Sequence, residues 1–302
     1  MRSSRRRKST TGVFPYLLVL PSLLFILGLT LYPIGFTLFL SFHQWNGLSP
    51  TMKFIGIGNF GRLFSDPVFW VALKNNVLFS TLVTFGTVII GLGLALILDK
   101  QIRGWRIYRN VYYFPVLLTN AVVALLWTRF YDPYIGLFNV LLKSIGLDQY
   151  AHPWLGDPNT AMLAVIVKEV WQYAGFPMII LLAGLASIPD PYLEAAQLDG
   201  ATYLKTVRWI ILPLLKNVLA ITIALQLIFS FKVFDTVWAM TFGGPGNTTQ
   251  VLATYMYTVS FGFSGPPMEF GYASSIATVM LIIIFPATLI YLRLVKLGEM
   301  RL

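Results

Sequence analysis

Charged residues are scarce in this sequence of 302 amino acids, where Asp, Glu, Lys and Arg together make up 11%. Hydrophobic residues make up 57%, and the mean hydropathy is +0.72. A soluble globular chain carries about 25% charged residues, so this chain lacks the polar surface that a water-facing globule needs. The composition argues against a soluble enzyme, a disordered chain and a fibrous repeat. It predicts an all-α polytopic membrane protein.

Cysteine is absent, and histidine is limited to His43 and His152. The chain therefore has no disulfide framework, no thiolate nucleophile and no Cys-ligated metal site, and two histidines do not suffice for a His-rich metal centre. We expect neither a metal nor a cofactor. The formal net charge of +10 would suit a nucleic-acid partner, but in a membrane protein it reflects Lys and Arg gathered on the cytoplasmic side. We expect no nucleic-acid partner.

Long apolar runs set the number of membrane-spanning helices, each of which needs about 20 apolar residues. The first run, 13–42, follows a basic segment as a signal peptide would, but it is too long and no small-residue cleavage site follows it. We interpret it as an uncleaved anchor. The other expected spans are 77–98, 110–128, 160–187, 214–240 and 270–292. Six spans place both termini on the same side of the membrane.

The distribution of basic residues predicts which side that is. With both termini in the cytoplasm, fifteen of the 22 Lys and Arg residues lie in cytoplasmic segments and five lie in external loops. Lysine and arginine concentrate on the cytoplasmic side of membrane proteins, so we predict an N-in, C-in topology. Residues 1–12 then form a basic cytoplasmic N-terminus, and residues 293–302 form a cytoplasmic tail.

The cytoplasmic segment 188–213 has a distinctive composition. Asp190 is placed to cap a short helix with proline at its first position, Gly200 can end that helix, and a second short helix can run to Pro213. Ala195 and its neighbour Ala196 leave a surface of small side chains, on which another backbone can approach closely. Glu194 presents a carboxylate to the cytosol. An ordinary interhelical loop is the alternative to a dedicated docking element.

The spacing in this segment argues against an ordinary loop. Glu-Ala-Ala is followed by three residues and Gly, and then by nine residues and Ile-x-Leu-Pro, at Glu194, Ala195, Ala196, Gly200, Ile210, Leu212 and Pro213. This pattern resembles the EAA loop of ABC importer permeases. Tyr32-Pro33, Phe114-Pro115 and Gly243-Gly244-Pro245 also resemble the carbohydrate branch of that family. The likeness to these MalF-like permeases of binding-protein-dependent importers covers essentially the whole chain.

The resemblance implies the type I ABC importer permease fold, in which helices two to six form a core at 73–292 and the first helix packs outside it. It implies that the segment 188–213 docks on an ATPase subunit, with Glu194 making the polar contact and Gly200 the turn. The coupling residues that it implies are Glu194, Ala195, Ala196, Asp199, Gly200, Ile210, Leu212 and Pro213. The implied partners are a second, homologous permease in a heterodimer, two ATP-binding subunits and an extracytoplasmic solute-binding protein.

Sequence motifs of catalysis are missing. The chain has no G-x-x-x-x-G-K-[ST] loop for ATP, no H-E-x-x-H and no G-x-S-x-G. We therefore expect a non-catalytic membrane subunit, with ATP hydrolysis on separate subunits. Secondary transporters usually show internal repeats, and no convincing repeat relates the two halves of this sequence. A secondary carrier, a channel and an intramembrane enzyme are the weaker alternatives.

Four charged residues fall within or beside the expected spans, where a charge costs about 2.5–3.5 kcal/mol at the membrane centre. For Lys168 and Lys232, snorkelling to the external interface with mutual pairing is the alternative to a functional role. Glu169 and Asp235 fall in the two segments where the resemblance to the carbohydrate permeases implies sugar contacts. These two carboxylates are the stronger candidates for a role in transport.

The residue types in these two segments suit a sugar. Acidic, amide and hydroxyl side chains can hydrogen-bond sugar hydroxyls, and aromatic rings can lie against the apolar face of a pyranose. Gln226, Phe229 and Ser230 share one helical face. Aromatic residues at helical spacing are more often core, which is the alternative here. The candidate substrate-path residues are Glu169, Trp171, Tyr173, Phe176, Gln226, Phe229, Ser230 and Asp235.

Together these patterns predict the permease subunit of an ATP-driven importer in the inner or plasma membrane of a bacterium or archaeon. Its expected substrate is a di- or oligosaccharide or a related solute, delivered by an external binding protein. A polyol or glycerol-phosphate importer is the alternative within the family, and an ion-coupled carrier is the alternative outside it. We expect the external segments 43–73, 129–159 and 241–269 to form the docking surface for the loaded binding protein.

Overall fold

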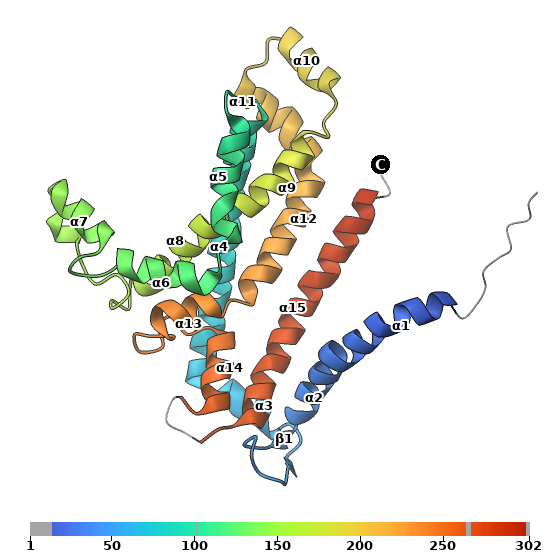
Figure 1. Cartoon of the computed structure of the whole chain (residues 1–302), viewed down its shortest axis with the longest axis vertical. Helices are drawn as coiled ribbons and strands as arrows, with labels where there is room; N and C mark the ends of the chain where they lie inside the picture. Colours follow the sequence, from blue (N-terminus) through green and yellow to red (C-terminus); the bar gives the residue numbers. More distant parts are fainter. Residues whose placement is uncertain (1–13, 101, 264–266, 300–302) are drawn as a thin grey trace, which may run out of the picture.

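The computed structural model describes residues 14–100, 102–263 and 267–299, and helices dominate these ranges (Figure 1). The expected basic N-terminus 1–12 and the end of the expected tail, 300–302, lie outside the described residues. The structure places α10, α11 and the end of α15 at one end of the molecule, and β1, α3 and α14 at the other (Figure 1). The first of these ends carries the segments whose basic residues predict a cytoplasmic location.

The helical elements occur in the following order along the chain. The N-terminal part contains α1 (Phe14–Ile26), the π-helical turn η1 (Leu27–Leu31), α2 (Tyr32–Leu40), α3 (Gly58–Ser65), α4 (Pro67–Asp99), α5 (Trp105–Leu117), α6 (Asn120–Phe130) and α7 (Leu137–Ser144). The remainder contains the 3-10 turn η2 (Asp148–Tyr150), α8 (Ala161–Tyr173), α9 (Gly175–Leu185), α10 (Asp190–Leu198), α11 (Tyr203–Thr206), the π-helical turn η3 (Val207–Ile211), α12 (Leu212–Phe231), α13 (Asp235–Thr241), α14 (Leu252–Phe261) and α15 (Phe270–Glu299). Two short strands, β1 (His43–Gln44) and β2 (Lys53–Phe54), pair antiparallel, with His43 opposite Phe54.

Four continuous helices within the described residues are long and apolar enough to cross a membrane. They are Tyr16–Leu40, Pro67–Asp99, Tyr203–Phe231 and Phe270–Lys296. Two bent pairs, α5 with α6 and α8 with α9, raise the number of crossings to six if each pair is counted as one span. The predicted all-α, polytopic architecture is therefore confirmed. The expected span 214–240 is interrupted in the structure, because the spanning helix ends at Phe231 and the separate helix α13 begins at Asp235.

The straight span expected at 110–128 is divided in the structure. Helix α5 ends at Leu117, α6 begins at Asn120, and the two axes differ in direction by 97°. Pro115 lies in the last turn of α5 and has no backbone N–H to donate, and Leu118 is extended with φ −79° and ψ 145°. The chain consequently leaves the helical conformation here and turns. In the same way, 160–187 bends by 41° between α8 and α9.

Helix α4 lies at the centre of the molecule and contacts α8, α9, α12 and α14 (Figure 1). Three clusters of buried apolar side chains fill the space around it, one with α6, α8 and α13, one with α3, α14 and α15, and one with α9 and α12. The first spanning helix instead diverges from this body (Figure 1), and its apolar window is unburied within the chain. Its side chains are therefore available to lipid or to another subunit.

Two glycines allow α9 to approach α4 and α5 closely. A side chain at Gly91 of α4 would meet the backbone nitrogen of Met178 at 2.9 Å and the Cβ of Pro177 at 2.8 Å, both on α9. A side chain at Gly175 would collide with the carbonyl oxygen of Tyr112 on α5. Only glycine fits these helix contacts without moving a backbone.

Asp66 joins the helices at the end opposite α10. Its Oδ1 accepts a hydrogen bond from the backbone N–H of Val68 at 2.8 Å and so caps α4, and its Oδ2 accepts from the hydroxyls of Tyr255 and Tyr272. Burial raises the pKa of this carboxyl, but the tyrosine hydroxyls and two backbone N–H groups together outweigh burial and hold the pKa below its usual value. One carboxylate thereby ties α4 to α14 and α15.

Candidate functional site

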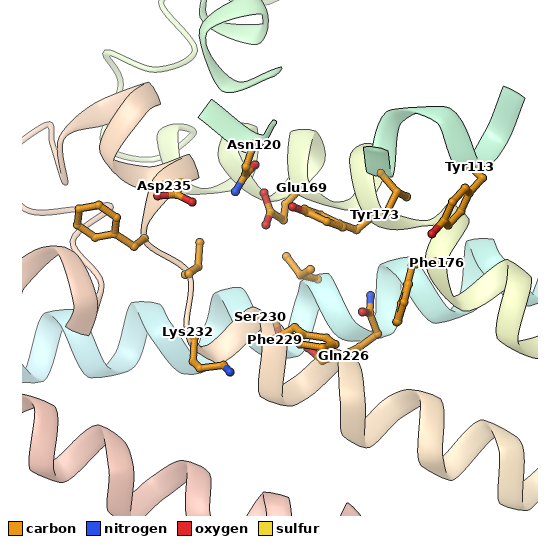
Figure 2. A pocket seen from close by; sticks show the side chains of 14 residues that line it. Tyr113, Asn120, Glu169, Tyr173, Phe176, Gln226, Phe229, Ser230, Lys232 and Asp235 are labelled. Carbon is orange, nitrogen blue, oxygen red and sulfur yellow. Dashed lines mark hydrogen bonds between the residues drawn. The ribbon is translucent and has the colours of Figure 1, made fainter. Parts of the chain in front are cut away.

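A cavity of about 430 Å³ opens between the bent pairs and helix α12. Asn120, Glu169, Tyr173 and Asp235 lie on one side of it, and Gln226, Phe229, Ser230 and Lys232 lie on the other (Figure 2). Its lining consists of Val83, Tyr113, Val116, Asn120, Glu169, Tyr173, Phe176, Gln226, Phe229, Ser230, Lys232, Val233, Phe234 and Asp235. The cavity thus combines aromatic rings with charged, amide and hydroxyl groups.

Seven of the eight substrate-path candidates line this cavity, and Trp171 does not. Glu169 and Tyr173 are four residues apart and share a face of α8, whereas Trp171 lies two residues from each and points to the opposite side. Its ring packs on Trp127 with centroids 5.4 Å apart, and 46% of the residue is exposed. The expectation that Trp171 contacts the path is therefore corrected, because helical periodicity turns its side chain away.

Helix α12 supplies one wall of the cavity. Gln226 is buried, and its amide donates a hydrogen bond to Oγ1 of Thr87 on α4 at 2.8 Å. The Ser230 hydroxyl donates to the carbonyl oxygen of Gln226 at 2.7 Å. Phe229 meets Phe176 of α9 edge to face, with centroids 6.1 Å apart. The wall therefore holds its polar groups in fixed positions next to a pair of aromatic rings.

Charged groups lie on both sides of the cavity (Figure 2). Glu169 on α8 and Asp235 at the first position of α13 both line it, as does Lys232, whose Nζ lies 5.7 Å from the ring centroid of Phe229. Lys168 does not line the cavity and is fully buried behind its wall, with 0% exposure. Snorkelling to the external interface is therefore excluded for Lys168, whereas its pairing with an acid is present, at 3.1 Å from Glu169.

Asn120 and Tyr113 are cavity residues that sequence reasoning did not single out. Asn120 is the first residue of α6, at the break that the expected span 110–128 concealed. Tyr113 lies two residues before the Pro that precedes this break. In the sequence, the signal for Asn120 was a polar side chain within an apolar run, a few residues after a proline. Among the described residues, no group of three or more His, Asp or Glu is placed to hold a metal ion.

The segment expected to dock on an ATPase forms helix α10, which projects from the end of the bundle (Figure 1). Its Glu194 is exposed and Ala196 is buried. Tyr192 and Leu198 expose 55% and 89% of their surface on the same helix. Gly200 follows in the left-handed region, with φ +70°, and Asp199 occupies the C-cap. The short helix and the turn at Gly200 agree with the expectation from the sequence.

The second half of this segment forms the expected second helix, which continues past its expected end at Pro213. Tyr203 begins a continuous helix that runs to Phe231, so Ile210, Leu212 and Pro213 lie within a membrane-spanning helix. A π-helical turn, η3, ends directly before Leu212. Pro213 follows this turn within the continuous helix, and because proline has no backbone N–H to donate, the regular helical hydrogen bonding is interrupted here. The cap of α10 also differs, because the capping position is Pro189 and the helix itself begins at Asp190.

The chain is similar to transport proteins over nearly its whole length. Residues 88–299 match the family of binding-protein-dependent transport system inner membrane components. A probable ABC transporter permease of Pyrococcus horikoshii is 36% identical over 98% of this chain and 100% of its own length. The probable permease YurN of Bacillus subtilis is 40% identical, over 95% and 97%. The trehalose/maltose transport system permease MalF of Thermococcus litoralis is 32% identical, over 95% and 94%.

The fold is also that of a solved importer. A crystal structure of a bacterial ABC transporter involved in the import of the acidic polysaccharide alginate contains a chain that matches with a TM-score of 0.77. The two chains are 25% identical, and the match covers 93% of this chain and 95% of the other. The predicted type I ABC importer permease fold and the multi-pass location in the membrane are thus confirmed. The chain belongs to the family of binding-protein-dependent transport system inner membrane components, as an ABC importer permease of the carbohydrate type.

Proposed function

We propose that this chain forms one half of the pathway through which an ATP-driven importer moves a di- or oligosaccharide or a related solute. The observation that carries the proposal is the cavity of about 430 Å³, whose walls set the rings of Phe176 and Phe229 beside the polar groups of Glu169, Gln226 and Asp235. Rings offer a surface for the apolar face of a sugar, and the polar groups offer partners for its hydroxyls.

The names of similar proteins support a sugar. One relative is the permease of a trehalose/maltose transport system, and another is the permease of a diacetylchitobiose uptake system. A further relative, 32% identical, is the permease of a sulfoquinovosyl glycerol transport system. That relative supports a glycerol-containing solute as the second candidate.

The proposed assembly contains a second, homologous permease, two ATP-binding subunits and an external solute-binding protein. Helix α10 is the proposed contact with an ATP-binding subunit, because Glu194, Tyr192 and Leu198 are exposed on a short helix beyond the spanning segments. The proposed docking surface for the loaded binding protein comprises 43–73, 129–159 and 241–269. A solved relative has been crystallised in complex with its alginate pentasaccharide-bound periplasmic protein, which supports an external partner of this kind.

Reconstituted transport tests the proposal. The chain is assembled in proteoliposomes with its partner permease, ATP-binding subunits and binding protein, and uptake of labelled maltose, trehalose and diacetylchitobiose is measured with and without ATP. We expect uptake of at least one sugar, and its loss in Gln226→Ala and Phe229→Ala while the complex still co-purifies. Trp171→Ala, which alters a side chain at a similar depth but off the cavity, is the matched control and should retain uptake.

Two outcomes would contradict the proposal. Uptake that runs on an ion gradient without any ATP-binding subunit would make the chain an ion-coupled carrier. Normal sugar uptake in both α12 variants would mean that the cavity is not on the path. Uptake of a glycerol derivative in place of the sugars would instead favour the second candidate.

A further inference from the structure

The ammonium group of Lys168 is bonded by three side chains from three helices, although the lysine is fully buried. Its Nζ donates to Oδ1 of Asn120 on α6, to Oε2 of Glu169 on α8 at 3.1 Å and to Oγ1 of Thr236 on α13 at 3.0 Å. Three donors therefore meet three acceptors, which uses the full hydrogen-bonding capacity of an ammonium group. The buried ammonium group is therefore paired with a carboxylate, and each of its three N–H donors has an acceptor.

Two of these three partners face the cavity, and the lysine does not. Asn120 and Glu169 belong to the cavity lining, whereas Lys168 and Thr236 lie behind it. The Thr236 hydroxyl lies 2.7 Å from Oε2 of Glu169 and 2.9 Å from Oδ1 of Asn120, and Figure 2 shows these two lining residues next to each other. Lys168 consequently holds, from behind, the two polar groups that a solute in the cavity meets from the front.

Stability does not account for a buried ion pair at this position. Removing two charges from water costs about as much as their attraction returns, and apolar residues of similar volume often serve as well or better. In a membrane-spanning helix, leucine at this position would lower the free energy of insertion, because a charged side chain in such a helix is costly. Charged residues that remain there mark functional positions. The pair is therefore best explained by what it does for the cavity.

We propose that Lys168 is a positioning residue that fixes Glu169 and cancels its charge, so that this wall offers hydrogen bonds to an uncharged solute. The proposal rests on the proposed function of the cavity as a sugar path. The charges near the cavity agree with it, because the acids Glu169 and Asp235 are matched by the bases Lys168 and Lys232. A balanced wall neither attracts nor repels a neutral sugar, whereas an unpaired carboxylate would hold water and cations in its path.

Charge-matched substitutions test this role in the reconstituted complex, with whichever of maltose, trehalose and diacetylchitobiose the wild type takes up. Lys168→Met leaves Glu169 unpaired, and Glu169→Gln leaves Lys168 unpaired. We expect each to lower the uptake rate per assembled complex about tenfold or more, because an uncompensated buried charge remains. The double variant Lys168→Met/Glu169→Gln removes both charges, and we expect its uptake rate to be severalfold higher than that of either single variant, because no uncompensated buried charge remains.

The pH dependence of uptake separates this role from a purely structural one. In Lys168→Met we expect uptake to rise as the pH falls from about 8 to about 6, because protonation neutralises an unpaired carboxylate. The double variant should show no such rise. The other ionisable groups on the cavity wall, Tyr113, Tyr173, Lys232 and Asp235, are the same in both variants, so they contribute equally to the two profiles.

The possible outcomes either support or overturn the positioning role of Lys168. Unchanged uptake in both single variants, or a double variant as impaired as the singles with no difference in pH profile, would overturn the positioning role while leaving sugar transport intact. A Lys168→Met complex that fails to assemble, although the double variant assembles and transports without pH dependence, supports the role through the rescue. If the wild type takes up none of the three sugars with ATP, the proposed function fails, and this inference fails with it.

Discussion

Single polar side chains hold helices together at the end of the molecule opposite α10. Asp66 accepts hydrogen bonds from Tyr255 on α14 and Tyr272 on α15 while it caps α4. Arg62 lies over the Tyr272 ring, 4.2 Å from its centroid, and pairs with Glu269 at 2.5 Å. One carboxylate thus links α4, α14 and α15 at this end of the molecule.

We expect Asp66→Asn to lower the free energy of unfolding by about 1–3 kcal/mol, because an amide leaves buried hydroxyl donors poorly matched. Thermal unfolding of the purified protein in detergent measures this change, with the exposed Asp148→Asn as the control. The folded-state pKa of Asp66 is depressed, so its contribution is present above the unfolded-state value of about 3.9 and is lost as the pH falls through the folded value. The difference between wild type and variant should therefore shrink below about pH 4. A difference that is constant at all pH values would contradict this account.

Gly200 is a second position where one residue decides the local structure. Its φ of +70° lies in the left-handed region, and no atom lies within 4 Å of where a Cβ would be. A side chain at this position would therefore strain the backbone but would not clash with a neighbouring atom. We expect Gly200→Val to misdirect α10 and to reduce ATP-driven uptake strongly, since a β-branched residue pays about 1–2 kcal/mol or more in this region.

Gly200→Asn provides the matched control, because asparagine tolerates the left-handed region better than other non-glycine residues. We expect Gly200→Asn to retain most uptake and to co-purify with the ATP-binding subunit. Equal loss in both variants would show that side-chain size matters at Gly200, and not backbone conformation.

At the scale of elements, the sequence predicted the existence of helices better than their directions. Apolar runs located the four long helices and the two bent pairs, although the run expected at 214–240 extends past the helix end at Phe231. Composition locates such segments because burial in lipid depends on it. The right-angle turn between α5 and α6 was missed, because Pro115 and the extended Leu118 change direction without changing hydropathy. In the coupling segment, Gly200 correctly marked the end of α10, whereas the second helix, expected to end at Pro213, runs from Tyr203 to Phe231.

The cavity shows the same limit of sequence reasoning. Helical periodicity placed Gln226, Phe229 and Ser230 together correctly, since they lie on one helix. Trp171 was included by its proximity along the chain, although its face of α8 points away. The bond from Lys168 to Asn120 joins positions 48 residues apart, and such long-range pairs depend on tertiary packing that a single sequence does not reveal.

Close packing of α4 on α9 gives a prediction about these elements. We expect Gly91→Leu to force the two helices apart and to destabilise the protein by about 1–3 kcal/mol, because the extra atoms meet the backbone of α9. Gly93→Leu is the control, since Gly93 lies two residues further along the same helix, is exposed and has no atom within 4 Å of its Cβ position. Thermal unfolding in detergent measures both. Equal destabilisation of the two variants would show that contact with α9 is not the cause, since leucine favours a helix more than glycine does.

At the scale of the whole molecule, the distribution of basic residues orients the bundle with α10 in the cytoplasm. The absence of cysteine makes this orientation directly testable. We expect a membrane-impermeant maleimide to label Tyr134→Cys in intact cells and Leu198→Cys only in inside-out vesicles. Both sites are well exposed, at 84% and 89%, so accessibility does not limit the reaction. The reverse pattern would invert the topology.

The exposed apolar side chains of α10 have a consequence for the synthesis of this protein. Tyr192 and Leu198 present their surfaces to water for as long as no other protein covers them, and apolar surface left uncovered favours aggregation. In a cell that makes this subunit in excess, the unassembled subunit would therefore be degraded by proteases. We expect the amount of intact protein in cells to follow the supply of the ATP-binding subunit, and co-expression of the two to raise the yield over expression of this chain alone.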